Sequence, residues 1–296
     1  MNNILITGAG GLLGSHLVPL LAGRGQVFAT ARSVRPETVD ARIVPLDLSR
    51  EIDLSALPAK VDSVIYLAQS SRFREFPDAA DDILAVNVAQ PIALLDYARR
   101  AGARNFVYAS TGGVYGSGDN PLVEDSPAPP PGQTLGFYPA TKRAAEILAE
   151  AWSPYLNVAI LRFFFIYGAG QKRDMLVPRL IDSVRQGRPV TLQGEDGLSI
   201  NPIHVSDAAI ATAAAAALER SATLNVAGPE VLSLRGMCDI IGRKLGREPA
   251  YETQPDRKPA DLVADISAMR DLLHDPAVRF EEGVEDLVET APDAAE

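Results

Sequence analysis

Short apolar runs alternate with longer amphipathic stretches through the first half of the chain. Strands are predicted at residues 3–7, 27–30, 61–68 and 105–109, and a helix is predicted at residues 12–22. The run VIYLA at residues 64–68 lacks polar alternation, which is typical of a strand covered on both faces. Strands that are separated by helices pair in parallel through right-handed crossovers. The pattern therefore predicts an α/β fold, a doubly wound parallel sheet of the Rossmann type.

After residue 168 the regular alternation weakens, and helices are predicted at residues 176–186, 207–218 and 234–245. We expect a smaller C-terminal α/β lobe here that binds the substrate. The dinucleotide-binding domain is assigned to residues 1–168 and about 204–228, and the substrate lobe to about 169–203 and 229–296. The proline-rich stretch at residues 125–132 is predicted to be an exposed loop that leads toward Tyr138.

The amino-acid composition indicates which classes of binding partner are not expected. The 296 residues are 47% hydrophobic and 22% charged, as in a globular protein, and the net charge is −10. Nucleic acids and anionic membranes need clustered Lys and Arg, so neither is an expected partner. The single cysteine, Cys238, is predicted to be a core thiol on the apolar face of a helix, and no metal site is expected.

The first residues of the chain, MNNILITGAG, lack the basic and apolar regions of a signal peptide. No uninterrupted apolar run approaches the ~20 residues that span a bilayer. We therefore expect a cytoplasmic protein that acts on a small molecule.

A glycine-rich turn joins the first predicted strand to the first helix. Its glycines, Gly8, Gly11 and Gly14, are spaced Gly-x-x-Gly-x-x-Gly, and Leu12 and Leu13 open the helix. Gly8 permits the tight turn, Gly11 lets backbone approach a pyrophosphate, and Gly14 allows close helix packing. The helix N-terminus then faces the anion. This position between strand and helix predicts dinucleotide binding.

The end of the second strand indicates which dinucleotide is preferred. NAD sites usually place Asp or Glu there, whereas the 2′-phosphate of NADP needs a cation. Here the strand has no acid and is followed by Arg32 and Ser33. We therefore expect NADP(H) to be favoured over NAD(H), with Arg32 on the 2′-phosphate and Ser33 assisting.

Several further motifs follow in a fixed order along the chain. They are Leu46-Asp47-Leu48, Val64-Ile65-Tyr66-Leu67-Ala68-Gln69, Val86-Asn87-Val88, the stretch from Ser110 to Gly116 (STGGVYG), Tyr138-x-x-x-Lys142, Leu161 to Gly168 (LRFFFIYG) and Ile203-His204-Val205. Together with the glycine turn they resemble the extended short-chain dehydrogenase/reductase family, the NAD(P)-dependent epimerase/dehydratase group that acts mostly on nucleotide sugars. The resemblance covers most of the chain.

The resemblance implies roles for individual residues. Thr111, Tyr138 and Lys142 would be catalytic, and Gly112, Phe165 and His204 would join Thr111 at the substrate. The cofactor would contact Asp47, Leu48, Leu67, Ala68, Gln69, Asn87, Tyr138 and Lys142, in addition to the glycine turn.

The chemistry of Tyr138 needs a neighbouring cation, because free tyrosine has a pKa near 10 and is a poor base at neutral pH. Lys142 lies one helical turn away on the same face. Its ammonium, with the positive nicotinamide of the oxidised cofactor, would lower the pKa of Tyr138, and Thr111 would donate to the substrate oxygen. Pro139 is predicted to start the helix and to bias Tyr138 away from helical torsions.

Two departures from the family pattern bear on the reaction. Phe165 stands where Asn is usual, and Ile200 stands where an Arg that helps hold a nucleotide diphosphate is common. Thr111 is followed by Gly112 instead of the acidic residue of family dehydratases, which disfavours dehydration. The predicted function is that of a nucleotide-sugar epimerase or ketoreductase, and the two are not separated. The alternatives are an NADPH-dependent reductase of a small non-nucleotide carbonyl and a catalytically silent NADP-binding regulator.

The resemblance also implies an oligomeric state. The helix that begins at Tyr138 and the helix at residues 81–100 resemble the pair through which this family forms a four-helix dimer interface. A homodimer is therefore expected.

Overall fold

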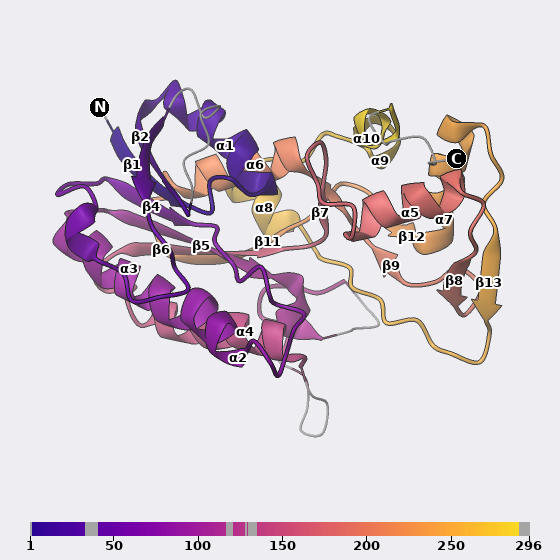
Figure 1. Cartoon of the computed structure of the whole chain (residues 1–296), viewed down its shortest axis with the longest axis horizontal. Helices are drawn as coiled ribbons and strands as arrows, with labels where there is room; N and C mark the ends of the chain where they lie inside the picture. Colours follow the sequence, from indigo (N-terminus) through magenta and orange to yellow (C-terminus); the bar gives the residue numbers. More distant parts are fainter. Residues whose placement is uncertain (1, 33–40, 117–120, 128, 130–134, 290–296) are drawn as a thin grey trace.

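The computed structural model describes residues 2–32, 41–116, 121–127, 129 and 135–289, and its largest element is a parallel sheet (Figure 1). The strands of this sheet are β1 (Asn2–Thr7), β2 (Gly25–Ala31), β3 (Ala41–Pro45), β4 (Ser63–Tyr66), β5 (Asn105–Thr111), β6 (Asn157–Phe163) and β11 (Ala222–Val226). They are arranged in the order β11-β6-β5-β4-β1-β2-β3, and every pairing is parallel. The predicted doubly wound α/β sheet is confirmed.

Helices cover both faces of the sheet (Figure 1). One face carries α1 (Leu12–Ala22) and α6 (Val205–Ala215), and the other carries α3 (Gln90–Arg100) and α4 (Phe137–Glu150). Ile4 and Ile6 of β1 belong to the first core, while Leu5 between them belongs to the second. Because successive strand side chains point to opposite faces, a strand with two covered faces must be apolar throughout. This explains the missing polar alternation.

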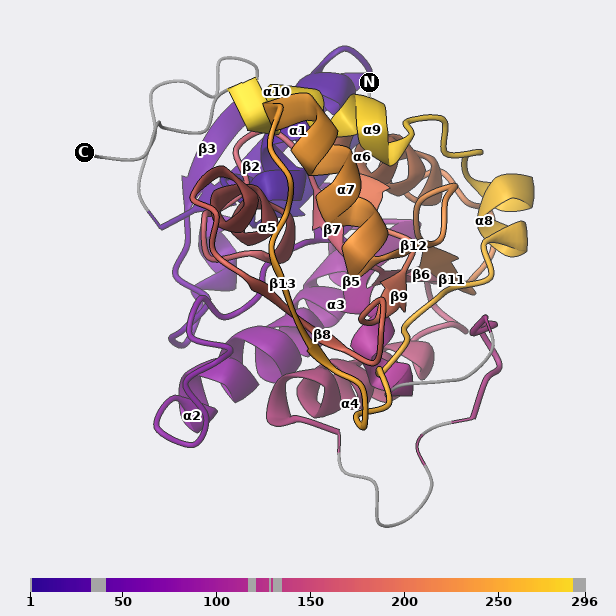
Figure 2. The ribbon, with the colours of Figure 1, turned by 90° about the vertical axis from the view of Figure 1, so that its right-hand side faces the viewer.

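A second group of elements packs around its own core (Figure 2). It contains α5 (Leu176–Arg185) and α7 (Leu234–Leu245), together with the parallel pair β8 (Val190–Gln193) and β13 (Tyr251–Gln254). Two shorter pairings lie nearby. These pair β7 (Ile166–Tyr167) with β10 (Ile203–His204), and β9 (Ser199–Ile200) with β12 (Leu232–Ser233).

Short elements complete the chain. They are α2 (Ala80–Leu84), α8 (Ser267–Leu272), α9 (Phe280–Gly283), α10 (Glu285–Glu289), the 3₁₀ turns η1 (Leu54–Ala56) and η3 (Gly112–Tyr115), and the π-helical turn η2 (Ala85–Ala89). Within the described residues, no helix is both long enough and apolar enough to cross a membrane. Cys238 on α7 is fully buried, and burial raises the pKa of its thiol to about 12, as suits a core thiol.

The start of α4 differs from the prediction. Pro139 was expected at the helix start, but the helix begins at Phe137 with Gly136 as its N-cap residue. The Ala140 N–H already donates to the Gly136 carbonyl at 3.1 Å. Pro139 is the third helical residue, where its missing N–H leaves no intrahelical bond unmade. Tyr138 thus belongs to the first turn, and the prediction that Pro139 starts the helix was wrong by two residues.

Candidate active site

The carboxyl ends of the sheet strands meet along one edge, where parallel α/β sheets bind ligands. The strand order reverses there between β1 and β4. Gly8 follows β1, Leu67 to Gln69 follow β4, and Thr111 ends β5, so segments that are far apart in sequence converge at this edge.

The glycine turn forms a backbone cradle with no room for side chains. Gly8 has φ +71°, and a Cβ on it would lie 2.8 Å from the Ala68 backbone nitrogen. A Cβ on Gly14 would lie 2.4 Å from the Gly8 carbonyl oxygen, while the Gly11 N–H donates to that oxygen at 3.0 Å. Gly11 is the N-cap residue of α1, so Leu12 and Leu13 present the first N–H groups of the helix. This cradle fits a dinucleotide pyrophosphate.

The segment after β4 closes onto this turn. The N–H groups of Leu67 and Ala68 donate to the carbonyl and the hydroxyl of Thr7, each at 3.3 Å. Gln69 follows directly and is exposed. The cofactor residues predicted after β1 and after β4 are therefore brought together.

Arg32 and Asp47 lie near each other beyond the ends of β2 and β3. Arg32 is exposed, and its charge helps to lower the pKa of Asp47. The larger cause is Ser49, whose hydroxyl and N–H donate to the Asp47 carboxylate at 2.7 and 3.1 Å. Leu48 is buried behind them. Ser33 lies outside the described residues.

Tyr138 and Lys142 stand one turn apart on α4 and face β5. The Lys142 side chain is only 1% exposed, and its Nζ donates to the Ala109 carbonyl at 2.8 Å. The same Nζ lies 4.9 Å from the centre of the Tyr108 ring. The Tyr138 hydroxyl donates to Gln69 Oε1 at 3.0 Å. A predicted catalytic residue and a predicted cofactor residue are thus in direct contact.

Burial shifts the pKa of both α4 residues. It lowers the pKa of Lys142 to about 7, with the Glu146 carboxylate opposing the shift, and it raises the pKa of Tyr138 to about 12. The interaction of Tyr138 with the Thr111 side chain works against its shift. Thr111 itself accepts a hydrogen bond from the Gly113 N–H at 3.2 Å. The three predicted catalytic residues therefore form one cluster.

Asn87 lies in η2 behind this cluster and is fully buried. Its Oδ1 accepts from the Ser70 N–H at 3.2 Å, and its Nδ2 donates to the Thr141 hydroxyl at 3.1 Å. The Tyr108 hydroxyl donates to the Asn87 carbonyl at 3.0 Å. Asn87 therefore joins the segment after β4 to α4 and holds backbone close to Tyr138.

The predicted substrate residues lie where β5 and β6 end and where β10 meets α6. Gly112 touches the Phe164 ring, since a Cβ on it would lie 2.6 Å from ring carbons. Phe165 has φ +48°, a conformation that bulky side chains rarely adopt. His204 is the N-cap residue of α6, and its Nδ1 interacts with the Ser206 hydroxyl at 2.7 Å. Its ring meets Tyr167 edge-on, with ring centres 5.4 Å apart.

Sequence reasoning missed the segment at residues 70–79, which lies against the start of α4. The Phe73 ring centre is 5.1 Å from that of Tyr138, and the Phe76 and Phe137 rings stack at 4.2 Å. Arg74 pairs with Asp174, beyond β7, at 2.9 Å. No motif marks these side chains, although their aromatic content and a cation beside the predicted site are the signals that could have indicated them.

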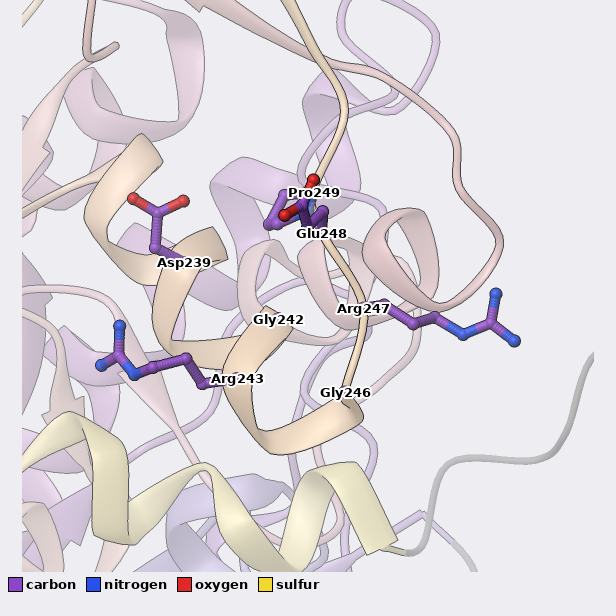
Figure 3. A pocket seen from close by; sticks show the side chains of 7 residues that line it. All are labelled: Asp239, Gly242, Arg243, Gly246, Arg247, Glu248 and Pro249. Atoms are coloured by element: carbon purple, nitrogen blue, oxygen red, sulfur yellow. The ribbon is translucent and has the colours of Figure 1, made fainter.

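A surface hollow of about 370 Å³ lies elsewhere, at the end of α7 (Figure 3). The side chains of Arg243 and Arg247 extend away from each other (Figure 3). None of the predicted site residues lines it.

Comparison with known proteins identifies the class of enzyme. The model of the NAD dependent epimerase/dehydratase family matches residues 4–227. The chain belongs to this family and is an enzyme that uses a nicotinamide cofactor.

Individual relatives span nearly the whole chain. The dTDP-glucose 4,6-dehydratase of Streptomyces griseus is 30% identical and covers 95% of this chain and 92% of its own length. The "Uncharacterized UDP-glucose epimerase YtcB" of Bacillus subtilis (strain 168) is 29% identical over 95% of both chains. Among solved structures, MoeE5 in complex with UDP-glucuronic acid and NAD is 30% identical, with a TM-score of 0.83 over 97% of this chain and 98% of that one.

Proposed function

We propose that this enzyme is an epimerase or ketoreductase that acts on a nucleotide sugar, with Tyr138 as its acid–base residue. The observation that carries the proposal is the cluster of Thr111, Tyr138 and Lys142 at the same sheet edge as the glycine cradle. The relatives named above, a dTDP-glucose dehydratase and a UDP-glucose epimerase, act on nucleotide sugars according to their names and support this substrate class.

Tyr138, Lys142 and Thr111 have separate roles in the proposed reaction. When bound, the nicotinamide accepts a hydride from the sugar carbon or returns it. Tyr138 takes the hydroxyl proton as the carbinol becomes a carbonyl and gives it back on reduction. Lys142 supplies positive charge beside the phenol, and Thr111 donates to the reacting oxygen. In this structure the Tyr138 hydroxyl donates to Gln69, and in our proposal it turns to the substrate when the substrate binds.

Dehydration is not part of the proposal, because no acidic side chain follows Thr111. The position is held by Gly112, and the Phe164 ring fills the space that any larger side chain would need. Phe164 is fully buried, so it has little freedom to give way. Acid-assisted elimination of water would therefore need a group from another segment.

The test is a panel of UDP- and dTDP-sugars incubated with the purified enzyme and either cofactor, with products resolved by chromatography and mass spectrometry. A sugar epimerised or reduced at a hydroxyl-bearing carbon is expected. Conversion of small aldehydes and ketones only would favour a reductase of non-nucleotide carbonyls. No conversion of any compound would favour the silent regulator.

The two-lobed division of labour is also proposed. Residues about 169–203 and 229–296 would bind the nucleotide sugar, and residues 1–168 and about 204–228 the cofactor. The separate apolar core around α5 and α7 supports this division.

Cofactor preference forms a finer proposal, in which Arg32 favours NADP(H) over NAD(H). Its support is an exposed guanidinium at the end of β2 and the absence of an acid in that strand. MoeE5 was solved with NAD, so the preference has to be measured on this chain. Arg32→Ala should weaken NADP binding about tenfold and leave NAD binding nearly unchanged. Arg50→Ala, an exposed cation beside Asp47, is the matched control. Tighter binding of NAD than of NADP by the wild type would refute the preference.

A homodimer through α4 and its neighbours is proposed as well. Leu84 on α2 and Ile147 and Leu148 on α4 are between 43% and 55% exposed. Light scattering should give a dimer for the wild type and a monomer for Ile147→Lys. Val231→Lys, at a similarly exposed apolar position away from α4, should remain dimeric. A monomeric wild type would end this proposal.

A further inference from the structure

Helix α4 carries a further buried charged residue on the face that bears Tyr138 and Lys142. Glu146 follows Lys142 by one turn and is fully buried. A carboxylate is rarely buried in this way without a function or a full set of partners. Neither the glycine turn nor the Tyr-x-x-x-Lys pair accounts for it.

The partners of Glu146 come from three elements. The Arg162 side chain on β6 donates to both carboxylate oxygens, with Nη2 at 2.8 Å from Oε2 and Nε at 3.1 Å from Oε1. Arg143 on α4 donates to Oε2 at 2.7 Å. The Ser110 hydroxyl on β5 donates to Oε1. All of these contacts except that with Arg143 lie in the core.

Ser110 links this carboxylate to the end of β5. Its neighbour Ala109 offers the carbonyl that holds Lys142 Nζ, and its other neighbour, Thr111, belongs to the catalytic cluster. Three consecutive residues of β5 therefore meet α4 through Lys142, Glu146 and Tyr138. The hydrogen bond that holds Ser110 in place therefore also holds its neighbours Ala109 and Thr111, which contact Lys142 and Tyr138.

Glu146 also acts on Lys142 through its negative charge. The groups that face Lys142 and Glu146 are Tyr138 and Arg143 on α4, Tyr108 on β5, Arg162 on β6, and Tyr115 on η3, whose hydroxyl accepts from Arg162. Without the carboxylate, Arg162 would lose its buried ion-pair partner, and Lys142 would lose the negative charge one turn along its helix. Burial already lowers the pKa of Lys142 to about 7, and Glu146 opposes this.

We propose that Glu146 is a positioning residue of the acid–base centre, which aligns β5 through Ser110 and keeps the Lys142 ammonium charged. The inference rests on the proposed function of Tyr138. It adds a carboxylate that acts on the reaction only through Lys142 and the end of β5.

The direct test measures the protonation of Lys142 without any turnover. The chain has only five lysines, so protein labelled with ¹³C at lysine Cε gives few signals, and Lys142→Met assigns the one from Lys142. In Glu146→Gln the pKa of Lys142 should fall below its wild-type value of about 7. Ser110→Ala removes the hydrogen bond but no charge, and it should leave the pKa near that of the wild type.

The kinetic test is the pH dependence of kcat on the nucleotide sugar found in the panel. In Glu146→Gln, kcat at pH 7 should fall about tenfold or more, and the rising limb should move to higher pH. The deficit should shrink toward pH 9, because Lys142, with a pKa of about 7, is then largely neutral in the wild type as well. Ser110→Ala should lower kcat by a similar factor at every pH.

Folding of the variant must be considered, since Glu146→Gln leaves Arg162 without its carboxylate. If that variant does not fold, Arg162→Gln tests the same claim in the opposite direction. It removes a buried cation while Arg143 still donates to the Glu146 carboxylate, so the pKa of Lys142 should rise.

The outcomes separate cleanly. An unchanged pKa of Lys142 in Glu146→Gln or in Arg162→Gln, or a loss of kcat that is uniform with pH in Glu146→Gln, overturns the proposal. A shifted pKa in an enzyme that converts no nucleotide sugar overturns the proposed function and leaves the role of Glu146 intact.

Discussion

The edge of the large sheet and the second lobe hold their polar groups in different ways. At the edge, β5 and β6 run side by side over seven residues, and Lys142 and Glu146 are buried with hydrogen-bond partners. Where the chain enters the second lobe, β7 pairs with β10 over only two residues. The Tyr167 hydroxyl and Gln171 Oε1 are buried there without a hydrogen-bond partner among the described residues.

We infer from this difference that the sheet edge carries out the chemistry and that the second lobe selects the substrate. Long parallel strands fix Thr111 and the α4 residues before anything binds, as preorganised catalysis requires. On the other side of the edge the strand pairings are short, and buried polar atoms lack hydrogen-bond partners. The arrangement of the side chains there therefore depends on the ligand that binds. Changes at the edge should therefore act on kcat and the pH profile, and changes in the lobe on KM.

The largest effect is expected for Lys142→Met. Burial raises the pKa of Tyr138 to about 12. In the proposed mechanism the Lys142 ammonium favours the phenolate during the reaction, so its loss should lower kcat about 100- to 1000-fold. KM for the nucleotide sugar should change little. A variant that keeps more than about a third of the wild-type kcat would contradict the role of Lys142.

The glycine turn offers a test with a matched control. A Cβ on Gly14 would overlap the Gly8 carbonyl, whereas one on Gly10 would meet nothing within 4 Å. Gly14→Ala should weaken cofactor binding about 10- to 100-fold, from an overlap that costs about 1–3 kcal/mol. Gly10→Ala should bind like the wild type, as measured by titration calorimetry. Equal affinities of the two variants would show that the cradle is not the cofactor site.

The pH dependence of stability provides a test without substrate. The pKa of Lys142 is about 7 in the folded chain and near its ordinary value when unfolded, so the unfolded chain binds one more proton between those values. Stability should therefore rise with pH above about 7, with a slope of up to about 1.4 kcal/mol per pH unit from this group. Denaturant unfolding from pH 6 to 9.5 should show this slope in the wild type and lose it in Lys142→Met. Identical slopes would mean that Lys142 is not buried as described.

The smallest effect is expected where the chain enters the second lobe, for Phe165→Asn. The Phe165 side chain packs against the cores of both lobes. Asn tolerates the positive φ of this position, so relief of backbone strain should offset part of the lost apolar contact. KM for the nucleotide sugar should change about threefold to tenfold, while the pH profile of kcat stays the same. A shift in the pH profile of kcat would contradict the separate roles of the two regions.

The sequence was most informative where backbone geometry restricts residue type. Gly8 and Gly14 are required by a positive φ and by a backbone approach, so the turn was predictable from spacing alone. Strands covered on both faces were predictable because they are continuous apolar runs. The doubly wound parallel sheet and the helix α1 followed from these two signals, whereas the order of the seven strands is known only from the structure.

Other parts of the site arise only from tertiary contacts. The Arg74–Asp174 pair joins residues 100 positions apart, and the pairing of Glu146 with Ser110 needs α4 laid across β5. No local pattern encodes either contact. The helix start at Phe137 was missed because Pro139 is compatible with several positions of the first turn.

The central claim is that Tyr138 moves the proton while the cradle holds the cofactor independently. Its most direct test is Tyr138→Phe, with nicotinamide absorbance at 340 nm followed after mixing the variant with cofactor and the nucleotide sugar identified in the panel. The account predicts a rate of hydride transfer at least about 1000-fold below that of the wild type, with a cofactor Kd within about twofold. Hydride transfer at a rate close to that of the wild type would contradict it.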